Sequence, residues 1–499
     1  MTLVRLDSFL VSDAPPLPPL SMAQVQQAVA AELDRIGAVI NELGARFAGA
    51  GHELYLVGGP VRDAMLGRLQ NDLDFTTDAR PEQTERLLKG WADAVWDMGR
   101  AFGTIGCRKG EWQVEITTFR SETYDPSSRK PDVDFGDSLA GDLGRRDFTV
   151  NAMAVSIPDR RFEDPYGGVV DLAHRVLRTP GRPEDSFSDD PLRMMRAARF
   201  SAQLGFTVAP EVVEAMRAMA GRIEIISAER VRDELVKLVC APFPRRGLTL
   251  LVETGLADHV LPELPALALE SDEHHRHKDV YEHTLTVLEQ AIEMEERLTP
   301  DGEPPRPDFV SRFAALMHDV GKPRTRKFVG DGTVTFHHHD VVGAKITRKR
   351  MKALRFSNDE IEAVSKLVEL HLRFHGYGSG EWTDSAVRRY VRDAGDQLER
   401  LHILTRADCT TRNARKAARL RRTYDDLEAR IERLSEEEEL ASIRPDLDGT
   451  QIMEILGIGP GREVGEAYKF LLELRMDEGP QDEEAARAAL LAWWGQRQA

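Results

Sequence analysis

The spacing of apolar and polar positions divides the chain into a first part that contains strands and a longer part that is helical. Apolar runs typical of short strands lie at 54–57, 73–77, 94–99, 104–109 and 112–120. A helical pattern at 81–91 falls between the second and third runs, and from Pro191 onward helical periodicity dominates. We therefore predict an α+β chain in which a small mixed sheet is followed by helices.

Segments beside these patterns mark the expected boundaries. Residues 22–50 predict one amphipathic helix, and 121–141, rich in Pro, Gly, Ser and Asp, predict a long loop. The proline-rich start predicts a disordered arm over 1–21. Charged segments at 265–278 and 435–445 predict two further boundaries.

Composition narrows the setting in which the chain works. The 499 residues favour about three domains. The three cysteines lack disulfide or metal spacing, and neither a membrane span nor a signal peptide is visible, so we expect a cytoplasmic protein. The net charge of −17 argues against indiscriminate nucleic-acid binding. The basic clusters at 345–355 and 412–422 are either local RNA-contacting surfaces or solvated helix faces.

Candidate chemistry gathers around the first pair of glycines. Gly58 and Gly59 follow a strand pattern and precede a helical one, where backbone can approach an anion closely. Asp72 and Asp74 alternate along the next strand, so their carboxylates share a face and repel each other unless a cation lies between them. Glu115, in a later strand pattern, is a third candidate. These residues alone indicate either a polar turn or a Mg²⁺-dependent phosphate site.

Motifs in a fixed order extend this picture. They are GGPVRD (58–63), DLD (72–74), RRDFTVNAMA (145–154), EDPYGGVVDL (163–172), DDPLRMMRAARF (189–200) and ERVRDEL (229–235). The series resembles the class II tRNA nucleotidyltransferases and the bacterial poly(A) polymerases, whose head is similar to DNA polymerase β. The resemblance covers about 50–240, and it implies transfer of a nucleotide to an RNA 3′-hydroxyl with release of pyrophosphate.

The resemblance implies a set of catalytic and nucleotide-binding residues. Asp72 and Asp74 would hold Mg²⁺ and act in catalysis. The residues expected to contact the nucleotide's phosphates or ribose are Gly59, Arg62, Arg145, Arg146, Asp147 and Asn151. Arginines suit phosphate, and Asp147 could accept a hydrogen bond from a ribose hydroxyl.

Base choice is assigned to a pair in the DDPLR motif. Asp190 and Arg193 stand three apart in a helical pattern, so we expect them on one helix face. Aspartate only accepts and arginine only donates, which suits the amine and ring nitrogen of cytosine and adenine and disfavours guanine and uracil. Arg196 and Arg199 align with family arginines near the nucleotide, or else serve helix packing. The family usually has Glu where this chain has Asp189, and ERVRDEL is expected to support the reading helix.

A second set of motifs follows from residue 277. His283, His318, Asp319 and Asp408 resemble the metal ligands of the HD phosphohydrolases, and His339 and His371 could extend the site to a second metal. Histidine and carboxylate ligands suit a transition metal. The alternative is a degenerate site retained for folding and tRNA contact.

The resemblances give the expected organisation. It comprises a disordered arm (1–21), a nucleotidyltransferase head (22–178), a helical neck with the base-reading helix (179–265), an HD domain (266–434) and a helical tRNA-binding tail (435–499). We expect Mg²⁺-dependent CCA addition to tRNA from CTP and ATP, with no membrane partner, and the loop at 121–141 favours full CCA over CC-only addition. The alternatives are a poly(A) polymerase, a CC-only or A-only adder, and an HD phosphohydrolase whose N-terminal half binds RNA.

Overall fold

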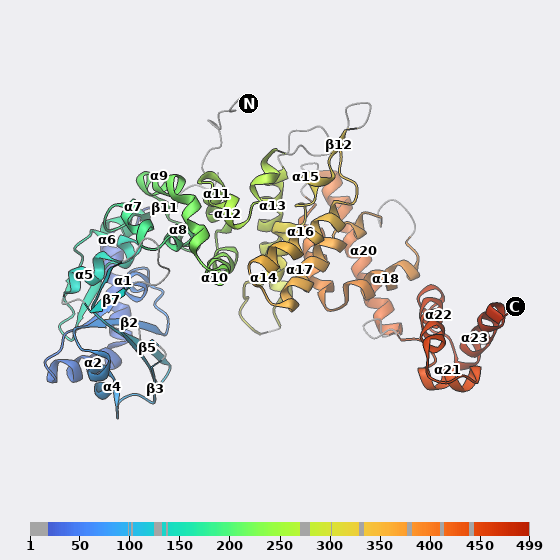
Figure 1. Cartoon of the computed structure of the whole chain (residues 1–499), viewed down its shortest axis with the longest axis horizontal. Helices are drawn as coiled ribbons and strands as arrows, with labels where there is room; N and C mark the ends of the chain where they lie inside the picture. Colours follow the sequence, from blue (N-terminus) through green and yellow to red (C-terminus); the bar gives the residue numbers. More distant parts are fainter. Residues whose placement is uncertain are drawn as a thin grey trace. The chain divides into compact units, whose positions relative to one another are not determined.

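The computed structural model describes most of the chain as two compact units, Met1–Pro262 and Glu263–Ala499 (Figure 1). The described residues are 18–97, 99–100, 103–123, 132–135, 138–269, 280–300, 302–328, 334–376, 382–409, 414–438 and 444–498. The expected disordered arm lies outside them up to residue 17, as does the charged segment 270–279. The predicted α+β class is confirmed, because a mixed sheet in the first unit is followed by helices.

The sheet of the first unit positions the predicted catalytic strand near its middle. Its strand order is β3-β4-β5-β2-β1-β8-β9. The strands are β1 (Leu54–Val57), β2 (Asp72–Thr77), β3 (Ala94–Trp96), β4 (Thr104–Lys109), β5 (Trp112–Thr118), β8 (Ala154–Ile157) and β9 (Phe162–Glu163). Strands β2 and β5 run parallel, whereas the other neighbours are antiparallel.

Helices surround this sheet and continue beyond it (Figure 1). They are α1 (Met22–Arg35), α2 (Gly37–Gly49), α3 (Gly59–Met65), α4 (Pro81–Leu88), α5 (Leu139–Gly144), α6 (Gly168–His174), α7 (Pro183–Asp189), α8 (Leu192–Leu204), α9 (Pro210–Met219), α10 (Ala228–Val239), α11 (Pro244–Glu253) and α12 (Ala257–Val260). Short 3-10 turns lie at Thr149–Asn151 and Ala220–Ile225, and β10 (Val176–Leu177) pairs with β11 (Thr207–Val208). Helix α2 buries Ile40, Leu43 and Phe47 completely, at the spacing of one helix face.

Two local expectations require correction. The single helix expected over 22–50 is two helices, because Ile36 leaves the helical region and Gly37, a poor helix former, begins the next helix. The flanks of the loop expected at 121–141 are ordered. Strands β6 (Arg120–Thr123) and β7 (Asp132–Phe135) pair antiparallel, and α5 begins at Leu139, while 124–131 and 136–137 lie outside the described residues.

The second unit is built mainly of helices. They are α13 (Val280–Glu293), α14 (Phe309–Met317), α15 (Lys322–Thr325), α16 (His339–Ala353), α17 (Asn358–Leu370), α18 (Asp384–Ala394), α19 (Leu398–Ala407), α20 (Ala414–Glu438), α21 (Gly449–Leu456), α22 (Arg462–Glu478) and α23 (Glu483–Gln498). Short 3-10 turns lie at Pro265–Leu269, Glu295–Leu298, Arg373–Gly376 and Gly395–Gln397, and β12 (Lys327–Phe328) pairs with β13 (Val334–Thr335).

The last three helices form a small group with a core of their own (Figure 1). Leu447, Ile452, Leu471 and Leu490 are almost completely buried there. Helix α22 also packs against α18 of the same unit. Across the described residues, no helix combines the length and the apolar character that a bilayer crossing requires.

Candidate active site and metal centre

Strand β2 presents two carboxylates on one face. Asp72 and Asp74 are exposed, whereas Leu73 and Phe75 between and beyond them are buried, as strand alternation requires. Asp74 lies opposite Glu115 in the parallel pairing with β5. Partial desolvation and the Glu115 carboxylate raise the pKa of Asp74 to about 6, and Arg146 and Arg62 oppose this rise. The strand therefore concentrates negative charge that a cation would relieve.

The glycine turn before α3 creates the space for one arginine of this site. Gly58 has a φ of +71°, which favours glycine, and a Cβ atom there would lie 2.6 Å from Nη1 of Arg146. Gly59, the residue predicted to touch the nucleotide, is the first residue of α3 and has no such crowding. The backbone angle and the nearby Arg146 therefore require glycine at position 58, but not at position 59.

A buried aspartate holds the two arginines of the RRD motif. Asp142 is completely buried, and its carboxylate accepts from Arg145 at 2.6 Å and from Arg146 at 3.1 Å. Burial alone would raise the pKa of Asp142, but the two guanidinium groups lower it. The motif comparison did not include Asp142. Its spacing of three and four residues from the arginines is the signal that could have identified it.

Asp147 and Asn151 join α3 to α8 through hydrogen bonds. Arg62 donates to Asn151 Oδ1 at 2.7 Å, and the Asn151 amide donates to Asp147 Oδ1 at 2.9 Å. Arg196 donates to Asp147 Oδ2 at 2.8 Å. Burial opposes ionisation of Asp147, but Arg196 and Asn151 hold its pKa well below the usual range. Asp147 is therefore an ionised, buried acceptor, and its two oxygens already accept hydrogen bonds from the protein.

The two residues predicted to read the base do not lie together on one helix face, contrary to the prediction from the sequence. Asp190 precedes α8, where its Oδ1 accepts from the backbone N–H of Leu192 at 3.1 Å, and Arg193 lies in the first turn. Pro191 separates the two residues at the helix start. Asp190 Oδ2 accepts from Arg230 at 2.8 Å. The ERVRDEL motif therefore contacts Asp190, one of the two residues predicted to read the base, directly.

Arg193 is held by α7 and by the RRD motif of the head. Its side chain is buried, and it donates to Ser186 Oγ at 2.9 Å and to the carbonyl of Arg145 at 2.5 Å. The structure thus brings the RRD motif and the DDPLR motif together. Their sequence separation is too large for any periodicity to indicate this contact.

The two further arginines of α8 face protein groups. Arg199 is buried and donates to Glu234 Oε2 at 2.5 Å, and its guanidinium lies 3.9 Å from the ring centre of Phe200. Arg196 bridges Asp147 and Glu234. Of the two interpretations open from the sequence, these contacts favour packing and positioning of α8.

The second unit gathers all six predicted HD residues. They form two groups, His283, His318 and Asp408, and Asp319, His339 and His371, whose ligand atoms lie within 4.8 Å of one another in each group. His283 Nε2 lies 2.9 Å from Asp408 Oδ1, and His339 Nε2 lies 3.3 Å from Asp319 Oδ1. Among the described residues, Asp72, Asp74 and Glu115 do not form a third set of this kind.

Three of these histidines have a fixed orientation. The Nδ1–H of His318, His339 and His371 donates to the carbonyl three residues earlier, at 2.8, 2.8 and 2.6 Å. A carbonyl only accepts, so Nε2 carries the lone pair in the neutral ring, as metal-ligating histidines require. Within the described part of the chain, the buried Nε2 of His371 has no hydrogen-bond partner. Burial and the nearby His318 lower the pKa of His371 to about 4, which keeps it neutral.

Lys322 is a further member of this group that sequence reasoning did not include. Its Nζ lies 2.8 Å from Asp319 Oδ2 and 5.6 Å from the ring centre of Phe336. Burial opposes ionisation of Asp319, but His318 and Lys322 hold its pKa well below the usual range. The sequence feature that could have identified Lys322 is its position three residues after Asp319, a spacing that lets the two side chains meet.

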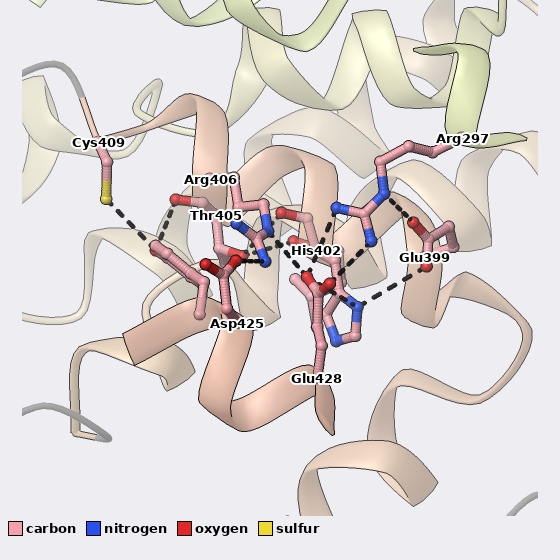
Figure 2. Close-up of polar contacts among 10 residues, drawn as sticks. Arg297, Glu399, His402, Thr405, Arg406, Cys409, Asp425 and Glu428 are labelled. Carbon is pink, nitrogen blue, oxygen red and sulfur yellow. Dashed lines mark hydrogen bonds and ion pairs between the residues drawn. The ribbon is translucent and has the colours of Figure 1, made fainter. Parts of the chain in front are cut away.

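A network of ion pairs fixes the helix that leads to Asp408 (Figure 2). Arg406 of α19 contacts Glu428 and Asp425 of α20, each at 2.8 Å. Arg297 contacts Glu399 at 2.6 Å and Glu428 at 3.0 Å. The Tyr424 hydroxyl donates to the Thr405 carbonyl at 2.6 Å. Because Asp408 is the C-cap of α19, these contacts fix the position of this predicted metal ligand.

Family models match three successive parts of the chain. Residues 54–178 match the Poly A polymerase head domain, and 205–267 match the "Probable RNA and SrmB- binding site of polymerase A". Residues 280–413 match the HD domain. Together these matches follow the order of the motifs in the sequence.

Curated relatives match over different lengths. An A-adding tRNA nucleotidyltransferase of Deinococcus radiodurans is 34% identical over 446 residues, which is 88% of this chain and 95% of that protein. The CCA-adding enzyme of Levilactobacillus brevis is 44% identical over 208 residues, 42% of this chain and 51% of that enzyme. The match to this CCA-adding enzyme thus spans about half its length.

Solved structures share the fold over nearly the whole chain. The Bacillus stearothermophilus CCA-adding enzyme in complex with CTP has a TM-score of 0.62 at 24% identity, covering 96% of this chain and 99% of that one. The Thermotoga maritima CCA-adding enzyme complexed with tRNA has a TM-score of 0.59 at 20% identity, covering 94% and 98%. At these identities the likeness concerns the fold.

Proposed function

Because this chain belongs to the tRNA nucleotidyltransferase family, we propose that it transfers CMP and AMP from CTP and ATP to the 3′ end of tRNA and completes the CCA sequence. The observation that carries this proposal is the head itself, where two carboxylates on one strand face lie beside arginines that suit a triphosphate. The likeness to enzymes solved with CTP and with tRNA supports the same substrates.

In this reaction the terminal 3′-hydroxyl attacks the α-phosphorus, the bond to the bridging oxygen breaks, and pyrophosphate leaves. Asp72 and Asp74 would hold Mg²⁺, which favours the ionised hydroxyl and neutralises the phosphates. Arg146 and Arg62 lie close enough to influence the pKa of Asp74, so they are suited to orienting the triphosphate. Asp142 keeps Arg146 in that orientation.

Asp190 and Arg193 would select the base. Each is fixed by a separate partner, Asp190 by Arg230 and Arg193 by Ser186 and the Arg145 carbonyl. An acceptor and a donor held in fixed positions suit the Watson–Crick edges of cytosine and adenine. The protein would therefore serve as the template, without a nucleic-acid guide.

A narrower reaction, addition of the terminal A alone, is the second candidate for the head. It is favoured by the relative that matches over 88% of this chain, which is an A-adding enzyme. The CCA-adding relatives match better in identity but over only 42% of this chain. Both reactions use the same metal and phosphate groups, so only substrate choice separates them.

Three truncated tRNAs distinguish these reactions. They end before CCA, after the first C and after CC, and each is incubated with Mg²⁺ and CTP, ATP or both. With both nucleotides present, we expect all three to be completed to CCA and extension then to stop. Extension of the CC-ended tRNA only would establish A addition, and long A tracts on unrelated RNA would establish a poly(A) polymerase.

We further propose that the second unit hydrolyses phosphate esters at a metal centre. The observation that favours this is that six ligand residues converge and three histidines direct Nε2 inward. These nitrogen and oxygen ligands fit one or two transition-metal ions, which would supply an activated water. In the reaction, water adds to phosphorus and one ester P–O bond breaks.

Metal content and hydrolysis test this second activity separately. We expect elemental analysis of the purified chain to find a transition metal, and an RNA ending in a 2′,3′-cyclic phosphate to be hydrolysed. Absence of both would support a degenerate centre retained for folding. Because its substrates are tRNA and nucleotides and its cysteines are free thiols, we expect the protein in the cytoplasm.

A further inference from the structure

The β12–β13 hairpin carries an exposed aromatic side chain among cations. Phe328 is 71% exposed, and the guanidinium of Arg326 lies 4.9 Å from its ring centre. Arg324 and Lys327 are exposed, and residues 322–328 hold four cations and no carboxylate in a chain of net charge −17. Single exposed apolar residues are common on proteins. The combination with local positive charge is what requires a specific explanation.

Both stems of this hairpin run directly into the HD centre. On one side Asp319 and Lys322 precede β12, and on the other His339 follows β13 by four residues. Given the rise of the short helix α15 and of extended chain, Phe328 lies no more than ~15 Å along the backbone from Lys322. Figure 1 shows β12 projecting from the helices next to α15. The last nucleotides of an RNA strand can span such a distance.

We propose that residues 322–328, including strand β12, bind the single-stranded 3′ end of an RNA, with the terminal base stacked on Phe328 and the terminal phosphate directed toward Lys322 and the HD centre. Aromatic faces bind any base by stacking, and neighbouring cations bind the backbone. One face of the ring is covered by Arg326, so the base stacks on the other. The inference rests on the proposed phosphohydrolase activity for its purpose, but the binding itself needs no metal.

Stacking is tested with a short RNA that carries 2-aminopurine and a 3′-phosphate at its last nucleotide. The full chain is used in EDTA, so that binding is read without metal or turnover, and the phosphate prevents the RNA from acting as a nucleotidyl acceptor. We expect the fluorescence of 2-aminopurine to fall on binding. Phe328→Ala should abolish this change and weaken binding by ~10-fold or more, whereas Phe328→Trp should retain it.

Controls separate stacking from general loss of structure. Phe162, another exposed aromatic residue, gives the matched variant Phe162→Ala, which should bind like the wild type. Wild-type fluorescence and affinity in Phe328→Ala would overturn the proposal. Equal affinity for the isolated 2-aminopurine nucleotide and for the RNA would overturn the assignment to RNA.

Salt dependence tests the cations. In single strands each neutralised phosphate contributes about 0.7 to the slope of log K against log salt, so Arg324→Gln with Lys327→Gln should reduce the slope by up to ~1.4. The exposed Arg306 gives the control Arg306→Gln, which should leave the slope unchanged. An unchanged slope in the double variant would contradict the proposal. Absence of hydrolysis with Phe328-dependent binding intact would refute only the phosphohydrolase.

Discussion

The head and the HD centre differ in how their charges are balanced. In the head, partial desolvation and Glu115 raise the pKa of Asp74 to about 6. In the HD centre burial acts in the same direction, but histidines and Lys322 hold the pKa values of Asp319 and Asp408 well below the usual range. A cation would therefore relieve the negative charge of the head, whereas the carboxylates of the HD centre are already compensated by its own histidines and Lys322. A site that binds a nucleoside triphosphate with its cation and releases pyrophosphate in each cycle is suited to carboxylates that its own residues leave uncompensated.

The largest expected effect would show that the two centres work independently. Asp72→Ala removes one of two carboxylates that the proposed Mg²⁺ requires, and we expect nucleotidyl transfer to fall by ~10³-fold or more. Metal content and hydrolysis at the HD centre should remain at wild-type levels, because Asp72 belongs to the other unit. Radiolabelled CMP and AMP incorporation measures the transfer. Wild-type incorporation by this variant would remove Asp72 from the site.

The reciprocal variant addresses the HD centre. Asp319→Asn keeps the side-chain size but removes the carboxylate shared by His318, His339 and Lys322. We expect metal affinity to fall by more than the ~10–100-fold that loss of an outer-shell partner costs, because Asp319 is a proposed ligand, while nucleotidyl transfer is unchanged. Elemental analysis after dialysis against a fixed metal concentration gives the occupancy. Full occupancy in the variant would mean that Asp319 serves structure and not metal binding.

Base choice gives the next effect. Arg193→Ala removes the donors of the proposed reading pair, and discrimination against UTP and GTP should fall by ~10–100-fold, the effect of losing one bidentate contact. Arg193→Lys keeps the charge without the planar fork and should restore it only in part. Single-turnover rates with each nucleotide measure the discrimination. An unchanged preference for C and A would assign base choice elsewhere.

A smaller effect is expected at Asp142, which contacts the two arginines proposed to bind phosphate. Asp142→Asn weakens the hold on Arg145 and Arg146, and we expect KM for CTP and ATP to rise by ~10-fold with a smaller change in kcat. Asp233→Asn, which removes an exposed contact to Arg232, is the matched control and should behave as wild type. Steady-state kinetics separate the two constants. Equal KM values in the two variants would contradict the positioning role.

The smallest effect concerns stability and pH. Because the pKa of Asp74 is raised in the folded state, its stabilising contribution is present below its ordinary value near 3.8 and is lost as pH rises through about 6. Above pH 6 without Mg²⁺, Asp74→Asn should therefore be more stable than the wild type, by ~1 kcal/mol after allowance for solvent screening. Calorimetry at pH 4.5 and 7.5 measures the difference, and Mg²⁺ should reduce it at pH 7.5. A difference that does not depend on pH would contradict the raised pKa of Asp74.

Local patterns predicted the parts of these sites that depend on neighbours along the chain. Strand alternation placed Asp72 and Asp74 on one face, and the paired His318 and Asp319 indicated the HD centre. The pattern misplaced Asp190 within a helix, because α7 ends at Asp189 and α8 begins only at Leu192, with Pro191 as its cap, so Asp190 lies between the two helices. Register, capping and exposure follow from a few adjacent residues, and these are what a sequence specifies most directly.

Contacts between residues that are distant in the sequence could not be predicted from local patterns. Arg230 contacts Asp190 from another helix, and the carbonyl of Arg145 accepts from Arg193. Each contact joins residues that are 40 or more positions apart in the sequence. Each therefore depends on the tertiary packing of the segments that carry them. Lys322 and Asp142 lie close in sequence to predicted residues, but their roles become visible only when the atoms they approach are known.

The two glycines before α3 look interchangeable in the printed sequence, yet they differ in how much change each tolerates. At Gly59 an added methyl group would meet only ordinary contacts, the nearest being Arg62 at 3.7 Å. At Gly58 it would occupy the place of the Arg146 guanidinium and require a strained backbone angle. A substitution there would displace a side chain 88 residues away. Sequence variation at 58 is therefore restricted twice, by the backbone angle and by the Arg146 guanidinium, and a change at 146 could relieve only the second restriction.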